Sequence, residues 1–196
     1  MKLRTLLAKA TLPALLVGVL GATPVAAAPE THAIDAVHST VLFRVKHMNV
    51  GYSYGRFNEF SGTVVLDAAS PAASSVKLEV KAASIDTANT KRDDHLRSPD
   101  FFNVAQFPTI TFESTAVAKV GDDAFEVTGD LTLLGVKKSV KVRMTKTGSG
   151  TDPQGGVRTG FEGTLAIKRS DFGMKYGLEG ISDEVGLTLA FETLKK

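Results

Sequence analysis

A short stretch of the chain, residues 90–103, gathers several side chains whose types could do chemistry. It reads T-K-R-D-D-H-L-R-S-P-D-F-F-N, which places carboxylates and a histidine among Lys91, Arg92 and Arg97. Such groups can transfer protons, ligate a metal ion or bind an anionic head group. The same pattern is also typical of a short solvated helix whose charges pair with one another.

Helix-capping signals favour the structural interpretation of this stretch. Thr90 followed by Asp93 fits an N-cap with an acid in the first turn, and Ser98 with Pro and Asp after it repeats the pattern. Two short helical turns are therefore predicted near 90–103. Asp93 and Arg97 are four residues apart, so we expect them to form an ion pair across one turn.

The remaining groups do not converge as a catalytic or metal site would require. Asp94 and His95 are adjacent, so on a helix their side chains point about 100° apart, and no H-E-x-x-H pattern is present. We therefore predict no catalytic residues and no metal site, while contact with the polar head of a ligand stays open. Phe101 and Phe102 in the next turn are expected to point into an apolar interior.

A second histidine, His47, shares the parity of Val41, Phe43 and Val45 in the run V-L-F-R-V-K-H. Residues two apart on a strand point to the same face, so His47 is expected on the apolar face. It is either a hydrogen-bonded core histidine or a polar contact to something held inside the fold.

Apolar and polar residues alternate through most of the chain beyond residue 30, so strands are expected to position the histidines and the charged stretch. Val76, Leu78 and Val80, for example, have charged residues between them, a pattern typical of strands with one apolar face. Clusters of Gly, Asp, Ser and Pro separate the runs. The predicted strands are 32–37, 40–49, 55–67, 74–86, 109–120, 123–134, 137–148, 156–169 and 184–194.

Long strands of this kind, joined by short connections, are expected to pair antiparallel and to close into a barrel. Closure buries the single apolar face of each strand and removes exposed edges. The predicted fold class is all-β, an extended eight-stranded antiparallel barrel with a short helical insertion near 90–103. Outer-membrane barrels alternate too, but they carry aromatic girdles, whereas this chain has three Tyr and no Trp. A water-soluble barrel is therefore favoured.

The first residues are typical of a targeting segment. Basic residues precede an apolar run, Leu12–Leu20, which is too short to span a bilayer and is followed by a small-residue cleavage site at Ala27 or Ala28. Residues 1–28 are predicted to be a cleaved signal peptide and residues 29–196 a single barrel domain. The predicted location is the periplasm, or outside the cell.

Charge and cysteine content narrow the function classes. The chain has 23 Lys and Arg against 21 Asp and Glu; three of the basic residues lie in the predicted leader, so the remainder carries a formal net charge of −1. This balance gives no support for a nucleic-acid partner. With no cysteine present, disulfides and thiolate metal sites are excluded.

Ordered motifs over about residues 32–194 carry a resemblance to a known family. They are Asp35-Ala-Val-His-Ser39, Phe43-Arg-Val-Lys-His47, Gly55-Arg-Phe57, Ser84-Ile-Asp-Thr87, Arg92-Asp-Asp-His-Leu96, Asp100-Phe-Phe102, Phe107-Pro-Thr-Ile-Thr-Phe112, Gly129-Asp-Leu-Thr-Leu133 and Arg169-Ser-Asp-Phe-Gly-Met174. Together they resemble the YceI family of exported, lipocalin-like proteins. The resemblance implies an extended lipocalin-like barrel whose apolar tunnel holds a long isoprenoid chain, such as a polyprenyl phosphate or an isoprenoid quinone.

Such a ligand suits an apolar barrel, because each buried CH₂ contributes about 0.8 kcal/mol. The bound lipid is then the expected partner, with no other cofactor, no nucleic acid and no membrane span, and a homodimer stays open. Polar head contacts are expected from Arg92, Asp94 and His95. Strand parity and the insertion together predict the tunnel lining: Phe43, Val45, His47, Val76, Leu78, Val80, Phe101, Phe102, Ile110, Phe112, Leu131, Leu133, Val142, Phe161, Leu165, Ile167, Leu187, Leu189 and Phe191.

Three functions fit this chain. The one we expect is a periplasmic lipid-binding protein, not an enzyme, that transports, stores or sequesters an isoprenoid. The second is an enzyme acting on a lipid or small molecule, with His95 or His47 as acid or base and Asp94 as its partner. The third is a stress-response interaction protein whose barrel is filled by its own side chains.

Overall fold

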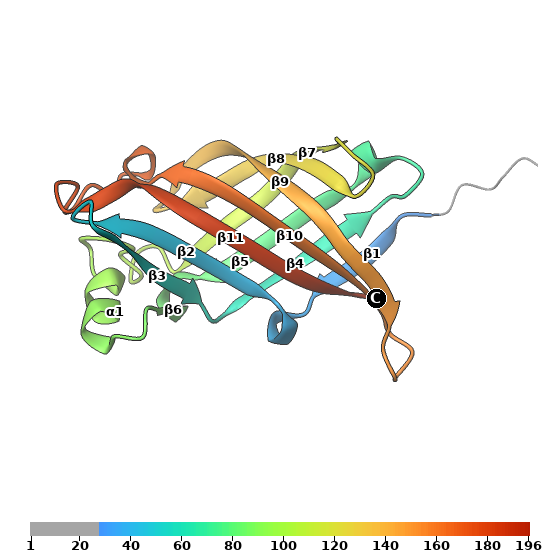
Figure 1. Cartoon of the computed structure of the whole chain (residues 1–196), viewed down its shortest axis with the longest axis horizontal. Helices are drawn as coiled ribbons and strands as arrows, with labels where there is room; N and C mark the ends of the chain where they lie inside the picture. Colours follow the sequence, from blue (N-terminus) through green and yellow to red (C-terminus); the bar gives the residue numbers. More distant parts are fainter. Residues whose placement is uncertain (1–27) are drawn as a thin grey trace, which may run out of the picture.

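The computed structural model describes residues 28–196, and most of these residues lie in one antiparallel sheet (Figure 1). The predicted signal peptide falls almost wholly outside the described residues. No helix among residues 28–196 is long and apolar enough to cross a membrane. The elements are β1 (Glu30–Ile34), η1 (Ala36–His38), β2 (Thr40–His47), β3 (Gly51–Phe57), β4 (Phe60–Leu66), η2 (Pro71–Ala73), β5 (Ser75–Lys81), η3 (Ala82–Ser84), β6 (Ile85–Asp86), α1 (Thr90–Arg97), β7 (Thr109–Lys119), β8 (Ala124–Leu133), β9 (Val136–Thr151), β10 (Val157–Lys168), η4 (Arg169–Phe172) and β11 (Ile181–Lys195).

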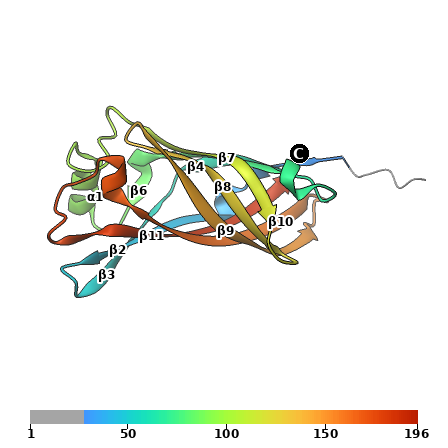
Figure 2. The same ribbon diagram turned by 90° about the horizontal axis from the view of Figure 1, so that it is seen from above.

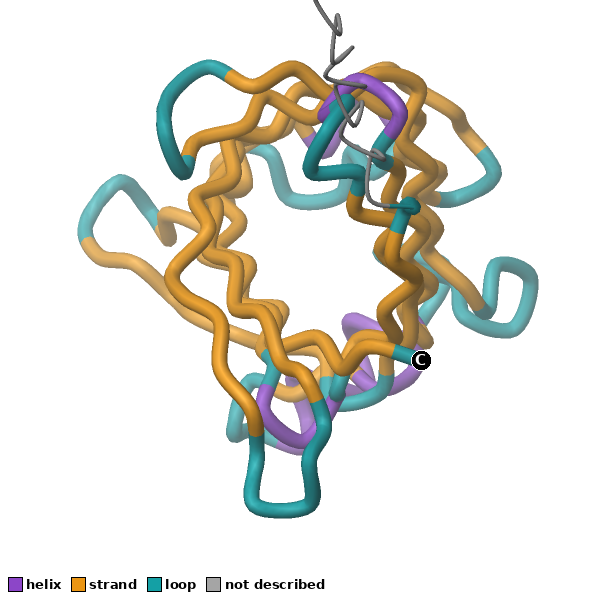
Figure 3. Tube along the Cα trace, turned by 90° about the vertical axis from the view of Figure 1, so that its right-hand side faces the viewer, coloured by secondary structure: helices purple, strands orange, loops and turns teal. Residues whose placement is uncertain are grey.

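The sheet closes into a barrel, as Figure 3 shows in a view along its length. Around the ring the strands follow the order β1, β4, β5, β7, β8, β9, β10 and β11, and β1 pairs with β11 to complete it. The fold is therefore the predicted eight-stranded antiparallel barrel. β2 continues the path of β1 along β11, β3 pairs with β2, and β6 pairs with the end of β3.

The first three barrel strands are each interrupted once. η1 separates β1 from β2, two residues separate β3 from β4, and η3 separates β5 from β6. The first break matches the predicted gap between 37 and 40. The turn between β2 and β3 differs from the prediction, because β2 ends at His47 and β3 already begins at Gly51. Met48 and Asn49 turn the chain there with φ angles of 49° and 55°.

The helical insertion differs in detail from its predicted form. One helix, α1, is present, and the residues after it form turns, so the second helical turn predicted at Ser98 was wrong. The N-cap is Asn89, whose side chain accepts from the Arg92 amide; Thr90 is the first helical residue. The start of α1 shifts by one residue because the free helix amides need an acceptor, which Asn89 supplies as well as Thr would.

The predicted Asp93–Arg97 ion pair was also wrong. Arg97 pairs with Asp94 at 3.1 Å and donates to the carbonyls of Ala83 and Ile85, which fastens α1 to η3 and β6. Asp93 is buried instead and accepts from the Thr87 amide at 2.9 Å and from its hydroxyl. Thr87, which lies outside the helix, thus binds the Asp93 carboxylate that helix spacing alone had assigned to Arg97.

The barrel interior is filled only in part. A cluster of buried side chains from β1, β4, β5, β6 and their neighbours includes Ile34, Phe60, Val64 and Phe191. At the end of the barrel where both described termini lie, His32 and Thr193 form a buried polar layer: the Thr193 hydroxyl lies 3.2 Å from His32 Nδ1 and donates to the Thr159 carbonyl. The rest of the interior is open and forms the site described next.

Candidate functional site: an apolar tunnel with a polar mouth

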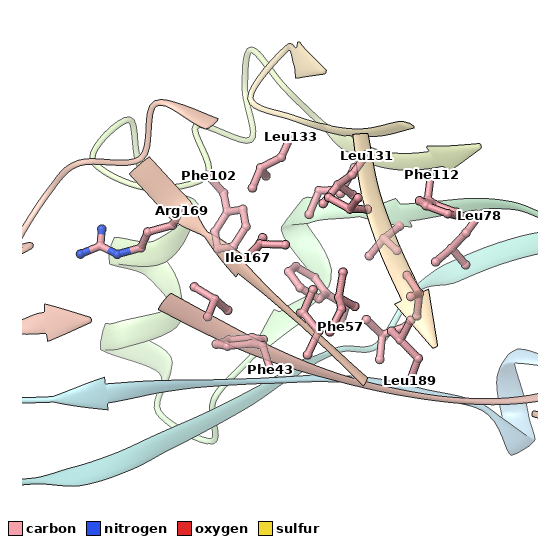
Figure 4. A pocket seen from close by; sticks show the side chains of 18 of the residues that line it. Phe43, Phe57, Leu78, Phe102, Phe112, Leu131, Leu133, Ile167, Arg169 and Leu189 are labelled. Atoms are coloured by element: carbon pink, nitrogen blue, oxygen red, sulfur yellow. The ribbon is translucent and has the colours of Figure 1, made fainter. Parts of the chain in front are cut away.

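A cavity of about 770 Å³ runs through the barrel. Tyr176 and His47 border it at the α1 end, and Ser74 and Phe125 border it near the other end. Its wall is mostly apolar, and Figure 4 shows side chains from strands on several sides pointing into it. All the residues predicted for the tunnel, including Phe101 and Phe102, lie in this wall.

Strand alternation explains why these side chains meet. Phe43 on β2, Leu78 on β5, Phe112 on β7 and Leu189 on β11 each occupy the inward parity of their strand, so the ring of strands brings them to one lumen. Leu131 on β8 pairs directly with Phe112 in the sheet. Many of these residues are only half-buried because they face the cavity.

Two glycines let aromatic rings lie close to the wall. Gly55 on β3 faces the ring of Phe43, and Gly129 on β8 faces the ring of Phe112; a Cβ atom at either glycine would overlap the ring. Both glycines lie on the inward parity of their strands. The two rings therefore occupy the space that side chains at these positions would take.

The polar lining residues gather mainly at the α1 end. Arg92 lies there in a fixed orientation, because its Nε donates to Thr87 Oγ1 and its Nη2 to the Thr87 carbonyl, both at 2.7 Å. Lys91 also lines the cavity and forms no ion pair with any other residue of 28–196. Two cations thus lie at the mouth of an apolar tunnel, an arrangement that suits an anionic or polar head group.

His95 closes part of this mouth by aromatic contacts. Its ring packs edge-on against Phe101 and Tyr176, with centroids 5.0 and 5.2 Å away, and its Nε2 lies 2.9 Å from Asp100 Oδ2. His47 borders the cavity at the end of β2 and is exposed, so it lies at the edge of the mouth and not in the core. Of its two predicted environments, the hydrogen-bonded core position was wrong.

Asp94 is not where the prediction put it. Its side chain is 69% exposed, pairs with Arg97 and lies outside the cavity lining. The helical offset from His95 explains this, since adjacent helix residues diverge by about 100°. His95 therefore has Asp100, not Asp94, as its carboxylate neighbour, and the acid–base pair imagined for an enzyme is not assembled.

Arg169 borders the cavity at its mouth, and Figure 4 shows it apart from the apolar side chains. It is 2% exposed, and it donates to the carbonyls of Met174, Tyr176, Ile181 and Ser182 at 2.7–3.2 Å. Burial lowers the pKa of the guanidinium, while the charges of Asp183 and Glu179 oppose that shift. This side chain holds the loop between β10 and β11 against the barrel.

Sequence reasoning missed several residues of the mouth. Thr87, Asn89, Lys91, Arg169 and Tyr176 all border the cavity. Lys91 belongs to the charged stretch, and its neighbour Arg92 was chosen in its place. Arg169 and Thr87 lie within the family motifs, which was the available signal for them. Tyr176 lies in a loop whose packing against His95 no local pattern indicates.

Fold and cavity together define a class, the closed antiparallel barrels that enclose an apolar cavity. The family follows from comparison with known sequences: the model of the YceI-like domain matches residues 32–193, and the chain belongs to this family. A UPF0312 protein of Azotobacter vinelandii is 43% identical over 190 residues, covering 96% of this chain and 99% of the relative. Protein YceI of Escherichia coli is 44% identical over 162 residues, covering 83% of this chain and 84% of the relative.

Solved structures agree with the fold. BcnA of Burkholderia cenocepacia superposes with a TM-score of 0.74 at 31% identity, over 81% of this chain and 98% of BcnA. The YceI protein of Campylobacter jejuni gives 0.70 at 30% identity, over 77% and 90% of the two chains. A polyisoprenoid binding domain from Saccharophagus degradans gives 0.67 at 19% identity, over 84% and 98%, and shows a shared fold alone.

Proposed function

We propose that this protein is an exported carrier that holds one long isoprenoid chain in the barrel, with its head group at the α1 end, and that it performs no catalysis. The observation that carries the proposal is the 770 Å³ cavity with its apolar wall and polar mouth. Ligand sites of small molecules have this volume, and few placed polar groups suffice to orient an apolar ligand.

The shape of the cavity supports a chain-like ligand. It extends from Tyr176 at the mouth to Phe125 near the far end, so a long, narrow molecule fits it better than a compact one. Each CH₂ of such a ligand contributes about 0.8 kcal/mol on leaving water. The ligand class matches the description of the Saccharophagus degradans domain, which shares the fold. The predicted leader supports the periplasm as the place of action.

Lipid extraction tests the proposal directly. Protein purified from its native host is extracted with organic solvent and analysed by mass spectrometry, and we expect a stoichiometric isoprenoid lipid. Replacement of Leu131 and Leu189 by Trp should fill the lumen and lower the lipid yield at least roughly tenfold, since both side chains point into the cavity.

A matched control is Leu42→Trp, because Leu42 lies on β2 with the outward parity and does not line the cavity. It should leave the lipid yield unchanged. A wild-type protein that carries no lipid and binds neither a polyprenyl phosphate nor an isoprenoid quinone in vitro would show that the proposal is wrong.

The head group can be assigned by a second pair of measurements. Lys91 and Arg92 at the mouth favour a phosphate. Lys91→Gln should therefore weaken binding of a polyprenyl phosphate about tenfold or more and leave that of a quinone with the same tail unchanged. Equal loss for both ligands would assign Lys91 to the tail path and not to the head.

The other two functions fit the described residues less well. A filled barrel is contradicted by the cavity itself. An enzyme using His95 lacks the Asp94 partner, since that carboxylate points away and pairs with Arg97. His95 is instead engaged with Asp100 and two aromatic rings, which suits a structural part of the mouth.

A further inference from the structure

Exposed apolar side chains concentrate at the mouth of the tunnel. Most of the largest ones among residues 28–196 lie in two segments, the β2–β3 hairpin and the β10–β11 loop: Met48, Val50, Tyr52, Tyr54, Tyr176 and Leu178. We call these six residues the rim. The others are isolated from one another: Val37 lies in η1, Val120 follows β7, and Val157 begins β10. Single exposed apolar residues need no explanation, whereas a gathered set marks an interaction surface.

The two segments of the rim form one surface. The Met48 amide donates to the Gly180 carbonyl at 2.7 Å, and Ile181 pairs with His47. Figure 2 shows the hairpin projecting beyond the neighbouring strands at the same end as α1. Tyr54 and Tyr176 also border the cavity. The rim is therefore continuous with the tunnel wall.

Met48, an apolar residue at the hairpin tip, has an unfavourable backbone conformation. Met48 and Asn49 both have positive φ, which makes a type I′ turn between His47 and Val50. Asn, Asp and Gly are preferred at such positions, so Met48 carries a conformational cost. The turn leaves Met48 67% and Val50 88% exposed at the tip of the hairpin.

The charge of the hairpin itself is of one sign, while the adjoining β10–β11 loop carries, after η4, one cation and one acid, Lys175 and Glu179. Residues 40–58 contain Arg44, Lys46 and Arg56 and no Asp or Glu. Arg56 pairs with Asp86, whereas Arg44 lies over the ring of Tyr52 at 4.5 Å and, like Lys46, forms no ion pair within residues 28–196. Apolar tip residues, interfacial tyrosines and unpaired cations together complement a bilayer surface with anionic head groups.

We propose that the rim docks onto an anionic lipid bilayer, with Met48 and Val50 inserted among the head groups, so that the tunnel mouth faces the membrane. This inference rests on the proposed isoprenoid ligand, whose solubility requires a membrane as source or acceptor. Tyr52 and Tyr54 then lie at the interface, and Arg44 and Lys46 face the lipid phosphates.

Vesicle flotation tests the docking. Wild-type protein should bind vesicles of phosphatidylcholine with phosphatidylglycerol, bind pure phosphatidylcholine vesicles more weakly, and lose the difference at high salt. The double variant Met48→Ser, Val50→Ser should lower the partition coefficient at least roughly tenfold. The matched control is Val120→Ser, Val157→Ser, with Val120 in the β7–β8 turn and Val157 at the start of β10, both at the opposite end of the barrel; it should bind as wild type does.

The ligand is measured separately in each variant, so that the two proposals fail differently. Retention of the isoprenoid by wild-type protein that does not float with anionic vesicles would overturn docking and leave the carrier function standing. Absence of isoprenoid would overturn the carrier function even if vesicles bound. A dimer that covers the rim would appear in sedimentation, dissociate in the double variant and show no vesicle binding, and this result would also overturn docking.

Discussion

Arg169 is the residue that most directly determines the shape of the tunnel mouth. Its guanidinium donates to the carbonyls of Met174 and Tyr176 in the β10–β11 loop and to those of Ile181 and Ser182 at the start of β11. Those carbonyls would otherwise lack a partner in a buried place, and an unpaired buried polar group costs about 1–3 kcal/mol. One side chain thus fixes a loop that has no regular structure of its own.

We predict that Arg169→Met lowers the free energy of unfolding by about 2–4 kcal/mol. Arg169→Lys should recover little of this loss, because an ammonium group lacks the planar fork that reaches several carbonyls at once. Urea denaturation gives the free energies. A Lys variant as stable as wild type would show that charge, and not the guanidinium fork, holds the loop.

A second arginine organises the opposite end of the barrel. Arg158 Nη1 lies 2.7 Å from Asp35 and 2.6 Å from Glu192, and its Nε lies 2.9 Å from Asp152. A hydrogen bond with His38, and then the one from Arg158, hold the pKa of Asp35 well below its ordinary value of 3.8. A lowered carboxyl pKa contributes stability above the ordinary value, and this contribution is lost as the pH falls through the lowered pKa.

We predict that Arg158→Met lowers the stability of the fold in a pH-dependent way. At neutral pH the variant leaves three carboxylates close together without their cation, so it should be less stable than wild type and the pKa of Asp35 should rise. As the pH falls below about 4 the carboxylates become protonated, and the difference in stability should shrink. Denaturation over a pH series, with an NMR titration of Asp35, measures both. A difference that stays constant with pH would contradict this account.

At the scale of elements, α1 is held in place by a buried carboxylate. Asp93 accepts from both the amide and the hydroxyl of Thr87, and Thr87 in turn orients Arg92 at the mouth. We predict that Asp93→Ala costs about 1–3 kcal/mol and loosens α1, which Arg97 alone then fastens to β6. Asp93→Asn, which keeps one acceptor oxygen, should cost less. Hydrogen exchange of the α1 amides, fast in the Ala variant alone, is the measurement.

The barrel strands could be predicted from sequence because alternation is a local signal with a strong physical cause. A strand with one buried face must alternate, and runs such as Val76, Leu78 and Val80 therefore reveal their inward side directly. The same parity predicted the cavity wall. The break before β2 was also predicted, since the strands expected at 32–37 and 40–49 leave His38 and Ser39 between them.

Tertiary partners decided the parts that could not be predicted. Helix spacing permits Arg97 to reach either Asp93 or Asp94. Thr87, outside the helix, binds Asp93 and so leaves Asp94 as the partner of Arg97. The β2–β3 turn lacks the Gly that usually signals a type I′ turn. Arg169 looked like a strand end, because nothing local indicates the loop carbonyls it binds.

The whole molecule combines a closed sheet with an incompletely filled interior. Tight packing is the rule for protein cores, and an apolar space of this size forfeits contacts that a filled core would have. The barrel wall is held together instead by the backbone hydrogen bonds of a continuous ring of paired strands. A ligand that fills the space should therefore add stability to a shell that already folds, and this coupling can be measured.

The last prediction follows from that coupling. A ligand that binds only the folded protein stabilises it by about 2.7 kcal/mol at a concentration of 100 times Kd, which for a domain of this size corresponds to roughly 5–10 °C in Tm. Delipidated protein should therefore melt lower than loaded protein, and its Tm should rise with added polyprenyl phosphate or quinone. The Leu131→Trp, Leu189→Trp variant should melt as high as delipidated wild type or higher, because its own rings fill the lumen, and should show no shift with ligand. Leu42→Trp should keep the full shift. Equal shifts in all three proteins would mean that the lipid binds outside the barrel.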